Sequence, residues 1–472
     1  EILRCLVGSE MCIRDSAKHR SLQVIADPLY WRQSAVQPSI AGIMQPADFD
    51  ITAYTALDDT AAYEKAGITT EQWNAKQAAA WYADGGDSET PSAYAWQGNN
   101  CWTLDALTAA REQGYDTVIA DASFDADQTE AVHTGTYVVH TPAGDVTVLK
   151  EQSTLGTLAK GQATSTDAQA ESSDAGRLAR LIAQSAFYQM EQPYAERNLL
   201  VCLNEDSDPS VVDALMSDIE QSPWLNLTDL ATLKDADISE DAASMSTDLP
   251  QTDGLTDGMR SDVQQTLSAL ANSSSNIKRF NTSILVKPNG KDESDVNTWS
   301  RQLTNAHTIM ALHALGGESP SRSTMAEGAN QLAALLINGV AITPTESVNV
   351  VSETAKMPVT ISNSHPYPVK VKVSSLTDSM QIVTSRFDTV QVPPHGEAQV
   401  AFTIRVSTSG TANATISLFD RNGAAFGATQ VTHITSALQI SDKSGFVIIG
   451  FAVLLGAVGL WRQFNRKKDP DE

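Results

Sequence analysis

The sequence predicts a multidomain protein: an α/β domain, a helical segment, an Ig-like β-sandwich and one C-terminal transmembrane helix. Strand-like and helix-like stretches alternate up to about residue 250, which is typical of parallel strands joined by helices. Apolar and polar residues then alternate with period two over residues 341–438, as in a sandwich. Residues 445–461 form an apolar run without a charge. With 472 residues, the chain is too long for one ordinary core.

The predicted α/β domain covers residues 17–250. A strand over 21–27 ends at Asp27 and Pro28, and Asp208 followed by Pro209 predicts the N-terminus of a helix. The remaining expected elements are strands at 50–59, 92–96, 115–120 and 198–203, helices at 60–83 and 103–113 and from 178 to before Pro193, and a hairpin insertion between 137 and 149. A polar loop is expected at 160–174.

The second half of the chain changes its pattern twice. Residues 251–340 are predicted to be helical, with breaks near Pro288 and Gly316. The alternating strands of the sandwich follow, separated by turn signals such as Pro393-Pro394 and Asn422-Gly423. A linker at 439–444 then leads to the predicted span at 445–461 and a tail at 462–472.

The flanks of the apolar run predict how the chain sits in a cell membrane. Four cations, Arg462, Arg466, Lys467 and Lys468, follow the run, which predicts a single pass with the C-terminus in the cytoplasm and the larger part outside. Residues 1–16 resemble a translated adapter sequence and are expected to be an artefact, so we expect a signal peptide that the sequence lacks. Cys101 and Cys202 then remain, either as one disulfide or as two buried thiols.

The charge balance excludes one class of partner. The chain has 57 acidic and 32 basic side chains, a net charge of -25, which argues against nucleic acid. We find no phosphate-binding glycine loop, serine nucleophile elbow or zinc knuckle, and we expect no cofactor. Two histidine pairs, His133 with His140 and His307 with His313, lack the spacing of metal ligands, so no metal site is predicted.

Carboxylates at strand ends are the candidate catalytic residues. A glycosidase needs two of them around the scissile bond, and the candidates are Asp27, Asp58, Asp59 and Asp121, with Asp125, Glu205 and Asp206 as further members. Aspartates at such positions also cap helices and form turns. Aromatic rings can stack on sugars, so the candidate glycan-binding residues are Trp73, Trp81, Trp96 and Trp102, although such tryptophans more often belong to a core.

Short motifs follow one another in a characteristic order. They are Asp27-Pro28, the acidic pair Asp58-Asp59, Ala66-Gly67, Trp96, Gly114-Tyr115, Pro193 and Pro223-Trp224-Leu225. Over residues 21–468 this order resembles an uncharacterised actinobacterial family of membrane-anchored cell-envelope proteins, often encoded beside the lipid II flippase. In that family the α/β region is similar to the barrel of polysaccharide deacetylases and glycoside hydrolases, which implies a barrel-like α/β domain here. The family's Pro-Tyr before the acidic pair is Ala56-Leu57 in this chain.

These observations favour a binding or scaffolding protein of the cell envelope, near cell-wall synthesis and without established catalysis. The resemblance implies proteins of wall synthesis or the flippase as partners, and a glycan is a further candidate ligand. One alternative is a glycan-active hydrolase or deacetylase-like enzyme with carboxylates at the barrel mouth. Another is a surface adhesion protein, for which the sandwich is the evidence.

Overall fold

The computed structural model describes most of the chain as two compact units. The described residues are 2–6, 19, 22–29, 39–83, 91–125, 132–203, 207–236, 249, 254–287, 291–316, 322–344, 347–437 and 443–464. Unit 1 comprises Glu1–Lys278 and Thr298–Ala334, and unit 2 comprises Arg279–Asn297 and Leu335–Glu472.

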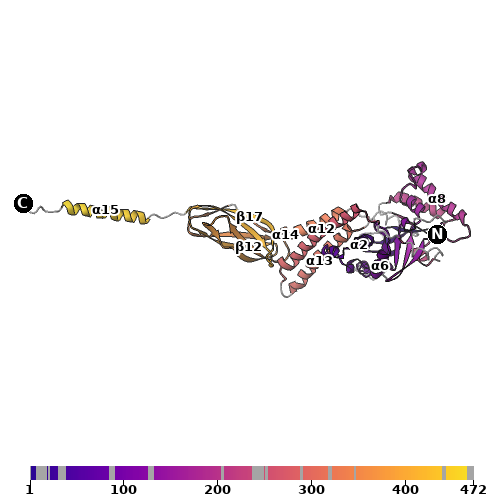
Figure 1. Ribbon diagram of the computed structural model, residues 1–472, viewed down its shortest axis with the longest axis horizontal. Helices are drawn as coiled ribbons and strands as arrows, with labels where there is room; N and C mark the ends of the chain where they lie inside the picture. Colours follow the sequence, from indigo (N-terminus) through magenta and orange to yellow (C-terminus); the bar gives the residue numbers. More distant parts are fainter. Residues whose placement is uncertain are drawn as a thin grey trace, which may run out of the picture. The chain divides into compact units, whose positions relative to one another are not determined.

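Unit 1 is built on a six-stranded sheet (Figure 1). Its hydrogen-bonded order is β2 (Gln23–Ala26), β3 (Ser39–Met44), β4 (Ala93–Trp96), β5 (Thr117–Ala120), β7 (Gly144–Lys150) and β6 (Thr136–Thr141). All neighbours are parallel except the hairpin of β6 and β7. A separate parallel pair joins β1 (Ile2–Leu6) to β8 (Leu199–Leu203). The alternation of strands and helices therefore predicts the parallel pairing correctly.

One expectation about this sheet is wrong: the hairpin is no insertion, because β7 pairs in parallel with β5 and extends the sheet. The barrel-like closure stays a prediction. The six-stranded order ends at β2 and β6, and a parallel bridge joins Glu151, directly after β7, to Leu200 in β8.

Helices connect and cover the strands of unit 1. Helix α6 packs on β6 and β7 and also contacts α2 (Figure 1). The helices are α2 (Ile51–Leu57), α3 (Thr60–Lys65), α4 (Thr70–Trp73), α5 (Ala75–Ala83), α6 (Leu104–Glu112), α7 (Ser153–Ala159), α8 (Asp174–Glu191), α9 (Pro209–Gln221) and α10 (Leu230–Lys234). Short 3-10 turns lie at η2 (Pro46–Asp48), η3 (Ala122–Asp125) and η4 (Gln169–Ser172).

Helix α2 replaces a predicted strand. Asp50 caps it, because the carboxylate accepts a hydrogen bond from the Ala53 N–H at 2.8 Å. The carboxylate also accepts hydrogen bonds from the Thr52 hydroxyl at 2.5 Å and the Asn99 N–H at 3.0 Å. This cap outweighs the strand preference of the alternating Ile-Thr-Ala-Tyr residues, which is a weak signal over so few positions.

Three long helices occupy the segment that was predicted to be helical. They are α12 (Asp257–Arg279), α13 (Lys291–Ala314) and α14 (Arg322–Asn338), and a π-helical turn, η5 (Phe280–Ile284), follows α12. In α12 the residues Val263, Leu267, Leu270 and Ile277 are buried at helical spacing.

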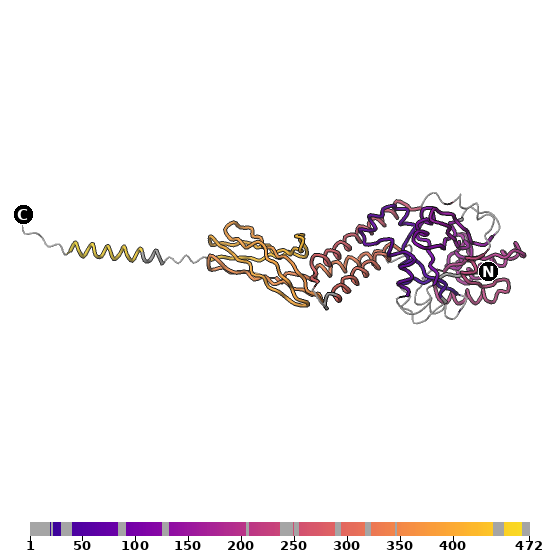
Figure 2. The backbone as a smooth tube through the Cα atoms, turned by 90° about the horizontal axis from the view of Figure 1, so that it is seen from below, coloured from indigo at the N-terminus to yellow at the C-terminus, as the bar shows by residue number. Residues whose placement is uncertain are grey.

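Unit 2 contains the predicted β-sandwich, whose strands lie side by side in orange and yellow in Figure 2. One sheet has the order β10 (Ser347–Val350), β17 (Ala425–Ser436), β16 (Gly410–Phe419), β12 (Val369–Thr377) and β14 (Phe387–Val392). The other has the order β13 (Ile382–Thr384), β15 (Gly396–Val406), β11 (Thr354–Asn363) and β9 (Val340–Ile342). Met357, Val359 and Ile361 in β11 are buried, and the residues between them are exposed or half-buried, as predicted.

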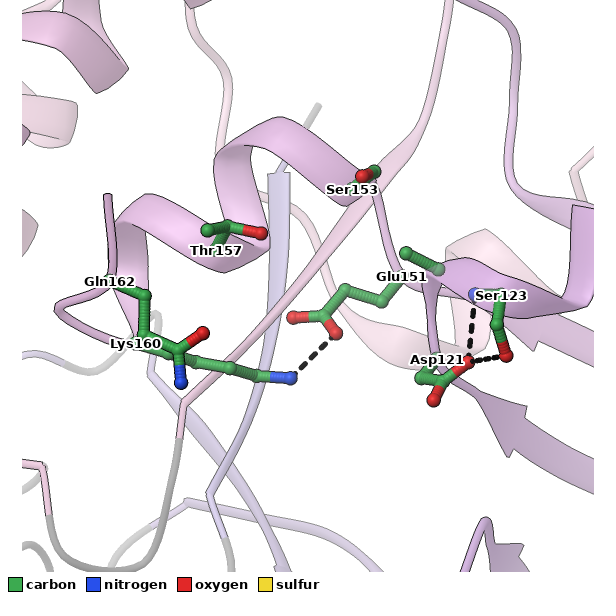
Figure 3. A pocket seen from close by; sticks show the side chains of 8 residues that line it. Asp121, Ser123, Glu151, Ser153, Thr157, Lys160 and Gln162 are labelled. Carbon is green, nitrogen blue, oxygen red and sulfur yellow. Dashed lines mark hydrogen bonds and ion pairs between the residues drawn. The ribbon is translucent and has the colours of Figure 1, made fainter. Parts of the chain in front are cut away.

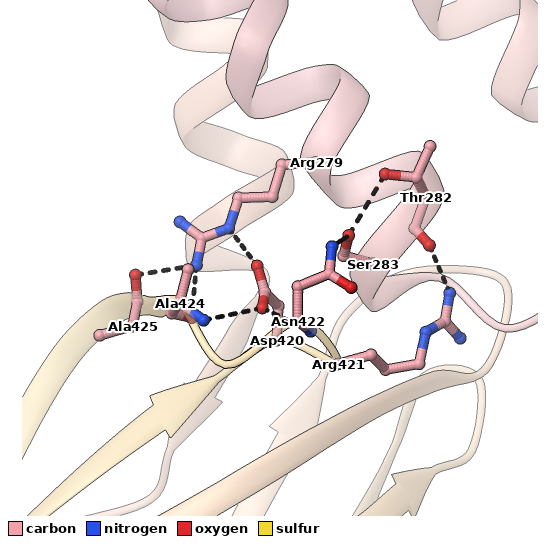
Figure 4. Close-up of polar contacts among 8 residues, drawn as sticks. All are labelled: Arg279, Thr282, Ser283, Asp420, Arg421, Asn422, Ala424 and Ala425. Atoms are coloured by element: carbon pink, nitrogen blue, oxygen red, sulfur yellow. Dashed lines mark hydrogen bonds and ion pairs between the residues drawn. The ribbon is translucent and has the colours of Figure 1, made fainter.

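An ion pair fastens the start of unit 2 to the sandwich (Figure 4). Arg279 Nε lies 2.6 Å from the carboxylate of Asp420, and its Nη2 donates to the Ala424 and Ala425 carbonyls. The Asp420 carboxylate also accepts hydrogen bonds from the N–H groups of Asn422 and Ala424. Burial alone would raise the pKa of Asp420, but these hydrogen bonds outweigh it, so its pKa lies below the ordinary value.

The transmembrane prediction is wrong. Residues Lys443–Phe464 do form a helix, α15. Within the described part of the chain, however, no helix combines the length and the apolar character needed to cross a membrane. The unbroken apolar run at 445–461 has 17 residues, at the short end of the lengths that cross a bilayer core. The predicted single pass, with its cytoplasmic C-terminus, is corrected together with the helix.

Candidate functional site

The four candidate carboxylates have different local surroundings. Asp27 is buried after β2, where it accepts hydrogen bonds from the N–H groups of Leu29 at 2.8 Å and Ala47 at 3.2 Å. Asp58 and Asp59 are exposed between two helices, at the C-cap of α2 and the N-cap of α3. Each of these three aspartates therefore has a place in a turn or a cap. Glu205 and Asp206 lie outside the described residues, as does the side chain of Asp125.

Asp121 is the candidate carboxylate that lines a cavity. It follows β5 directly and is exposed. Its carboxylate accepts hydrogen bonds from the Ser123 N–H at 2.8 Å and the Ser123 hydroxyl at 2.5 Å, and its own N–H donates to Gln97 Oε1. These contacts fix the side chain at the carboxyl end of β5.

The four tryptophans divide into two kinds. Trp73 and Trp102 are 1% exposed, so their faces contact protein. Trp73 stacks on Phe49 at 5.2 Å between ring centroids, and Trp102 Nε1 donates to the Ile119 carbonyl at 2.9 Å. Trp81 and Trp96 are half-buried and pack against hydrophobic clusters. Glycan stacking therefore stays a prediction for Trp81 and Trp96, whose rings keep some exposed area.

The histidines serve local structure in unit 1. His307 Nε2 lies 2.8 Å from the buried Ser273 hydroxyl, and burial lowers the pKa of His307. Burial also lowers the pKa of His313, to about 4. His133 contacts the Thr134 carbonyl at 2.9 Å, and His140 lies 2.6 Å from Asp145.

Two open questions about ligands and thiols can be answered for the described residues. No group of three or more His, Cys, Asp or Glu side chains within the described ranges could hold a metal ion. Cys101 and Cys202 are not joined by a disulfide, and Cys202 is buried in β8.

A polar cavity at the carboxyl ends of β5 and β7 is a candidate site, and we call it the Glu151 pocket (Figure 3). Its volume is about 280 Å³. The carboxyl ends of parallel strands are where open α/β sheets bind ligands. The pocket is lined by Asp121, Ala122, Ser123, Glu151, Ser153, Thr157, Lys160 and Gln162.

Glu151 is the buried charge of this pocket. It follows β7 directly and is 4% exposed. Its Oε2 lies 2.7 Å from Lys160 Nζ, and its Oε1 accepts a hydrogen bond from the Cys202 N–H at 3.2 Å. Burial raises the pKa of Glu151, and Lys160 and the Cys202 N–H only partly offset that rise, while nearby Asp121 adds to it.

A glycine makes room for the Glu151 side chain. A Cβ atom at Gly156, in helix α7, would lie 2.2 Å from Glu151 Oε1. Any larger residue would displace the carboxylate or the helix. Gly156 is therefore part of the architecture of the site, although it does not line the cavity.

Sequence reasoning missed Glu151, although a signal was present. The carboxylate comes directly after a strand, as Asp121 does, and this is the position from which the other candidates were chosen. The sequence before it predicts a hairpin inserted into the domain, and an inserted hairpin would not place its end among the ends of the parallel strands. The pairing of β5 with β7 places Asp121 and Glu151 on the same edge of the sheet.

The arrangement is suited to holding a polar ligand. The side chains of Ser153, Thr157 and Gln162 make no hydrogen bond within the described chain, so their polar groups are available to a ligand. The Glu151 carboxylate is directed at Lys160 in Figure 3, and Asp121 is held by Ser123 beside it.

Solved structures are similar to parts of the chain, at low identity. They include WR4, a C. elegans MSP family member, with 8% identity, coverage of 21% of this chain and 99% of that chain, and a TM-score of 0.17. The ASH/PapD-like domain 7 of human CEP192 has 14% identity, coverages of 21% and 87%, and a TM-score of 0.18. The CARDB domain of PF1109 from Pyrococcus furiosus has 17% identity, coverages of 21% and 94%, and a TM-score of 0.17.

Sequence comparison gives a clearer result. No curated protein matches the chain. One family model matches residues 14–472, which is nearly the whole length. The chain therefore belongs to the family of unknown function DUF6049.

Proposed function

We propose that this protein works by binding: the Glu151 pocket holds a hydroxyl-rich ligand of the glycan class, and the chain acts as a scaffold near cell-wall synthesis. The observation that carries the proposal is the pocket, in which every lining residue except Ala122 has a polar side chain. Its volume of about 280 Å³ suits a small ligand or one unit of a larger one.

The state of Glu151 favours binding over catalysis. A glycosidase holds two carboxylates on opposite sides of the scissile bond. Here Glu151 is directed at Lys160 at 2.7 Å, and Asp121 is held by Ser123 (Figure 3). Hydroxyl and amide groups make up most of the remaining lining, and these groups orient a ligand without reacting with it.

The scaffolding part of the proposal rests on the family resemblance and on the second unit. The motif order resembles proteins of the cell envelope, which makes proteins of wall synthesis or the flippase the proposed partners. Unit 2 adds a β-sandwich with large exposed side chains, such as Met380 and Phe387, outside the pocket-bearing unit.

Ligand binding is tested by titrating wall-derived glycan fragments into the full chain and measuring heat or NMR saturation transfer. Thr157→Val removes one unengaged hydroxyl of the pocket, and about a five-fold loss of affinity is expected for one hydrogen bond. Thr266→Val is the matched control, because that hydroxyl donates to the Asp262 carbonyl of its own helix and does not line the pocket. Equal binding by the two variants would remove the pocket from the proposal.

Scaffolding is tested separately, by capture from an envelope extract. The full chain is expected to recover proteins of cell-wall synthesis, and a chain with a disrupted sandwich is expected to recover fewer. Recovery of none of them by the intact chain would contradict the scaffolding role and leave the ligand-binding role standing.

A glycan-active enzyme is the second candidate, because Asp121 and Glu151 line the same cavity in different environments. Burial raises the pKa of Glu151, while Asp121 is exposed. Two carboxylates in surroundings that differ in burial are typical of acid–base pairs. Release of reducing ends from wall glycan, lost in Glu151→Gln, would favour this candidate. Binding without any release would favour the first.

A further inference from the structure

The Glu151 pocket has an incomplete charge balance. It contains the carboxylates of Asp121 and Glu151 and one cation, Lys160, which lies 2.7 Å from Glu151. Asp121 forms no ion pair with any residue that the structure describes, and its hydrogen-bond partner is neutral Ser123. The pocket therefore presents one unbalanced negative charge to a ligand.

The negative charge of Glu151 is also only partly balanced by its neighbours. Lys160 and the Cys202 N–H stabilise its charged form, yet burial outweighs them and its pKa stays raised. The Asp121 charge contributes in the same direction, which means that the two carboxylates repel each other across the pocket. A second positive charge between them would relieve that repulsion.

The other lining groups are neutral and suit hydroxyl substituents. Ser153, Thr157 and Gln162 offer hydroxyl and amide groups that make no hydrogen bond within the described chain. An anionic ligand would have to displace Glu151 from Lys160 and would also meet Asp121. The net charge of -25 further raises the local concentration of cations over anions.

We propose that the Glu151 pocket selects a ligand that carries both a protonated primary amine and hydroxyl groups, such as a 2-amino sugar. The ammonium group lies beside Asp121, on the side where the two carboxylates repel, and the hydroxyl groups contact Ser153, Thr157 and Gln162. This inference rests on the proposed glycan-binding function and specifies the chemical class of its ligand.

The test compares three sugars that differ at one substituent: glucosamine, glucose and N-acetylglucosamine. Each is titrated into the full chain at mildly acidic pH, where the amine is protonated, and affinity is measured by calorimetry or NMR saturation transfer. Glucosamine is expected to bind about ten-fold more tightly than the two neutral sugars, because one charge-assisted contact at an exposed carboxylate contributes about that factor. The preference should shrink as salt is raised.

Asp121→Asn is the decisive variant, since it removes the charge and keeps an acceptor for Ser123. It is expected to abolish the preference for glucosamine and to retain the binding of glucose. Asp218→Asn is the matched control: Asp218 is exposed on α9, does not line the pocket and changes the net charge equally. The preference should persist in that control.

The outcomes separate this inference from the function on which it rests. Equal binding of glucosamine and glucose by the unaltered chain would overturn the amine selectivity and leave glycan binding in place. A preference that survives in Asp121→Asn would also overturn it. Failure of all three sugars and of larger wall fragments to bind would overturn the glycan-binding function itself.

Discussion

Each unit of the molecule contains a buried carboxylate paired with a basic side chain: Glu151 with Lys160 in unit 1, and Asp420 with Arg279 in unit 2. The pKa of Glu151 is raised and that of Asp420 is lowered. Asp420 accepts hydrogen bonds from Arg279 and from the N–H groups of Asn422 and Ala424, so its buried charge is well compensated. Among the described residues, the Glu151 carboxylate has only Lys160 and the Cys202 N–H as partners.

This difference in hydrogen bonding distinguishes the Arg279–Asp420 pair, which has a structural role, from the Glu151–Lys160 pair, which belongs to a candidate binding site. Arg279 also donates from Nη2 to the Ala424 and Ala425 carbonyls, so both members of this pair make further hydrogen bonds. The Glu151–Lys160 pair borders a cavity, where a ligand can supply further hydrogen-bond donors or positive charge. A buried ion pair indicates function when its compensation is incomplete and solvent can reach it.

The largest effect on stability is expected from breaking the Arg279–Asp420 ion pair. Arg279→Ala leaves Asp420 buried without its cation, which should lower the free energy of unfolding of unit 2 by about 3–5 kcal/mol. Thermal or urea denaturation measures the loss. Arg405→Ala, at an exposed position of β15, is the control and should change stability by less than about 0.5 kcal/mol. Equal losses of stability in both variants would contradict the stabilising role of the Arg279–Asp420 pair.

A smaller loss is expected from breaking the incomplete pair. Lys160→Met keeps the aliphatic length of the side chain and removes the ammonium group, and we expect a loss of about 1–3 kcal/mol in unit 1. The loss is smaller than for Arg279 because Glu151 can take up a proton, which its surroundings already favour. Chemical denaturation at neutral pH measures it, and a loss above that of Arg279→Ala would reverse the comparison.

The two carboxylates should respond to pH with opposite signs. The lowered pKa of Asp420 means that its contribution is present above the unfolded-state value and is lost as pH falls through the folded value. The raised pKa of Glu151 means that its contribution is present below the unfolded-state value and is lost as pH rises through the folded value. Stability measured against pH for Asp420→Asn and Glu151→Gln, each relative to the unaltered chain, checks both slopes, and slopes of the same sign would contradict this account.

The smallest effect is expected at Gly156. Gly156→Ala places a Cβ at 2.2 Å from Glu151 Oε1, so the carboxylate must move away from its position beside Lys160. The better helix propensity of alanine offsets part of the cost, and the net loss should be about 1 kcal/mol. Gly328→Ala in α14 is the control, since its nearest neighbour would be the flexible Met310 side chain at 3.3 Å. A gain in stability at position 156 would show that Glu151 moves freely.

Much of the fold could be predicted because its signals are local. Asp208 and Pro209 begin α9 as expected, and the alternation of Met357, Val359 and Ile361 marks a sandwich strand. The strand predicted around Tyr54 was wrong because a single cap at Asp50 decides a helix of seven residues. Local patterns therefore predicted elements well where several residues agreed.

The candidate site was less accessible from the sequence. Asp121 was chosen for its place after a strand, and the structure does place it in the pocket. The position of Glu151, Lys160 and Gly156 near Asp121 depends on which strand lies beside β5. The periodicity of the sequence does not predict the order of strands in a sheet. The transmembrane prediction was drawn from a run of 17 residues, at the short end of the spanning range, and no helix of the described residues is long and apolar enough to cross a membrane.

The close approach of Gly156 to Glu151 also has an evolutionary consequence. With 2.2 Å between the Glu151 carboxylate and a Cβ at position 156, the two positions cannot vary independently. Members of the family that keep a glutamate at position 151 should keep glycine at 156, and those with a larger residue at 156 should have a shorter side chain at 151. The residues at positions 151 and 156 should therefore covary, and a glutamate together with a glycine should identify the members that retain the pocket.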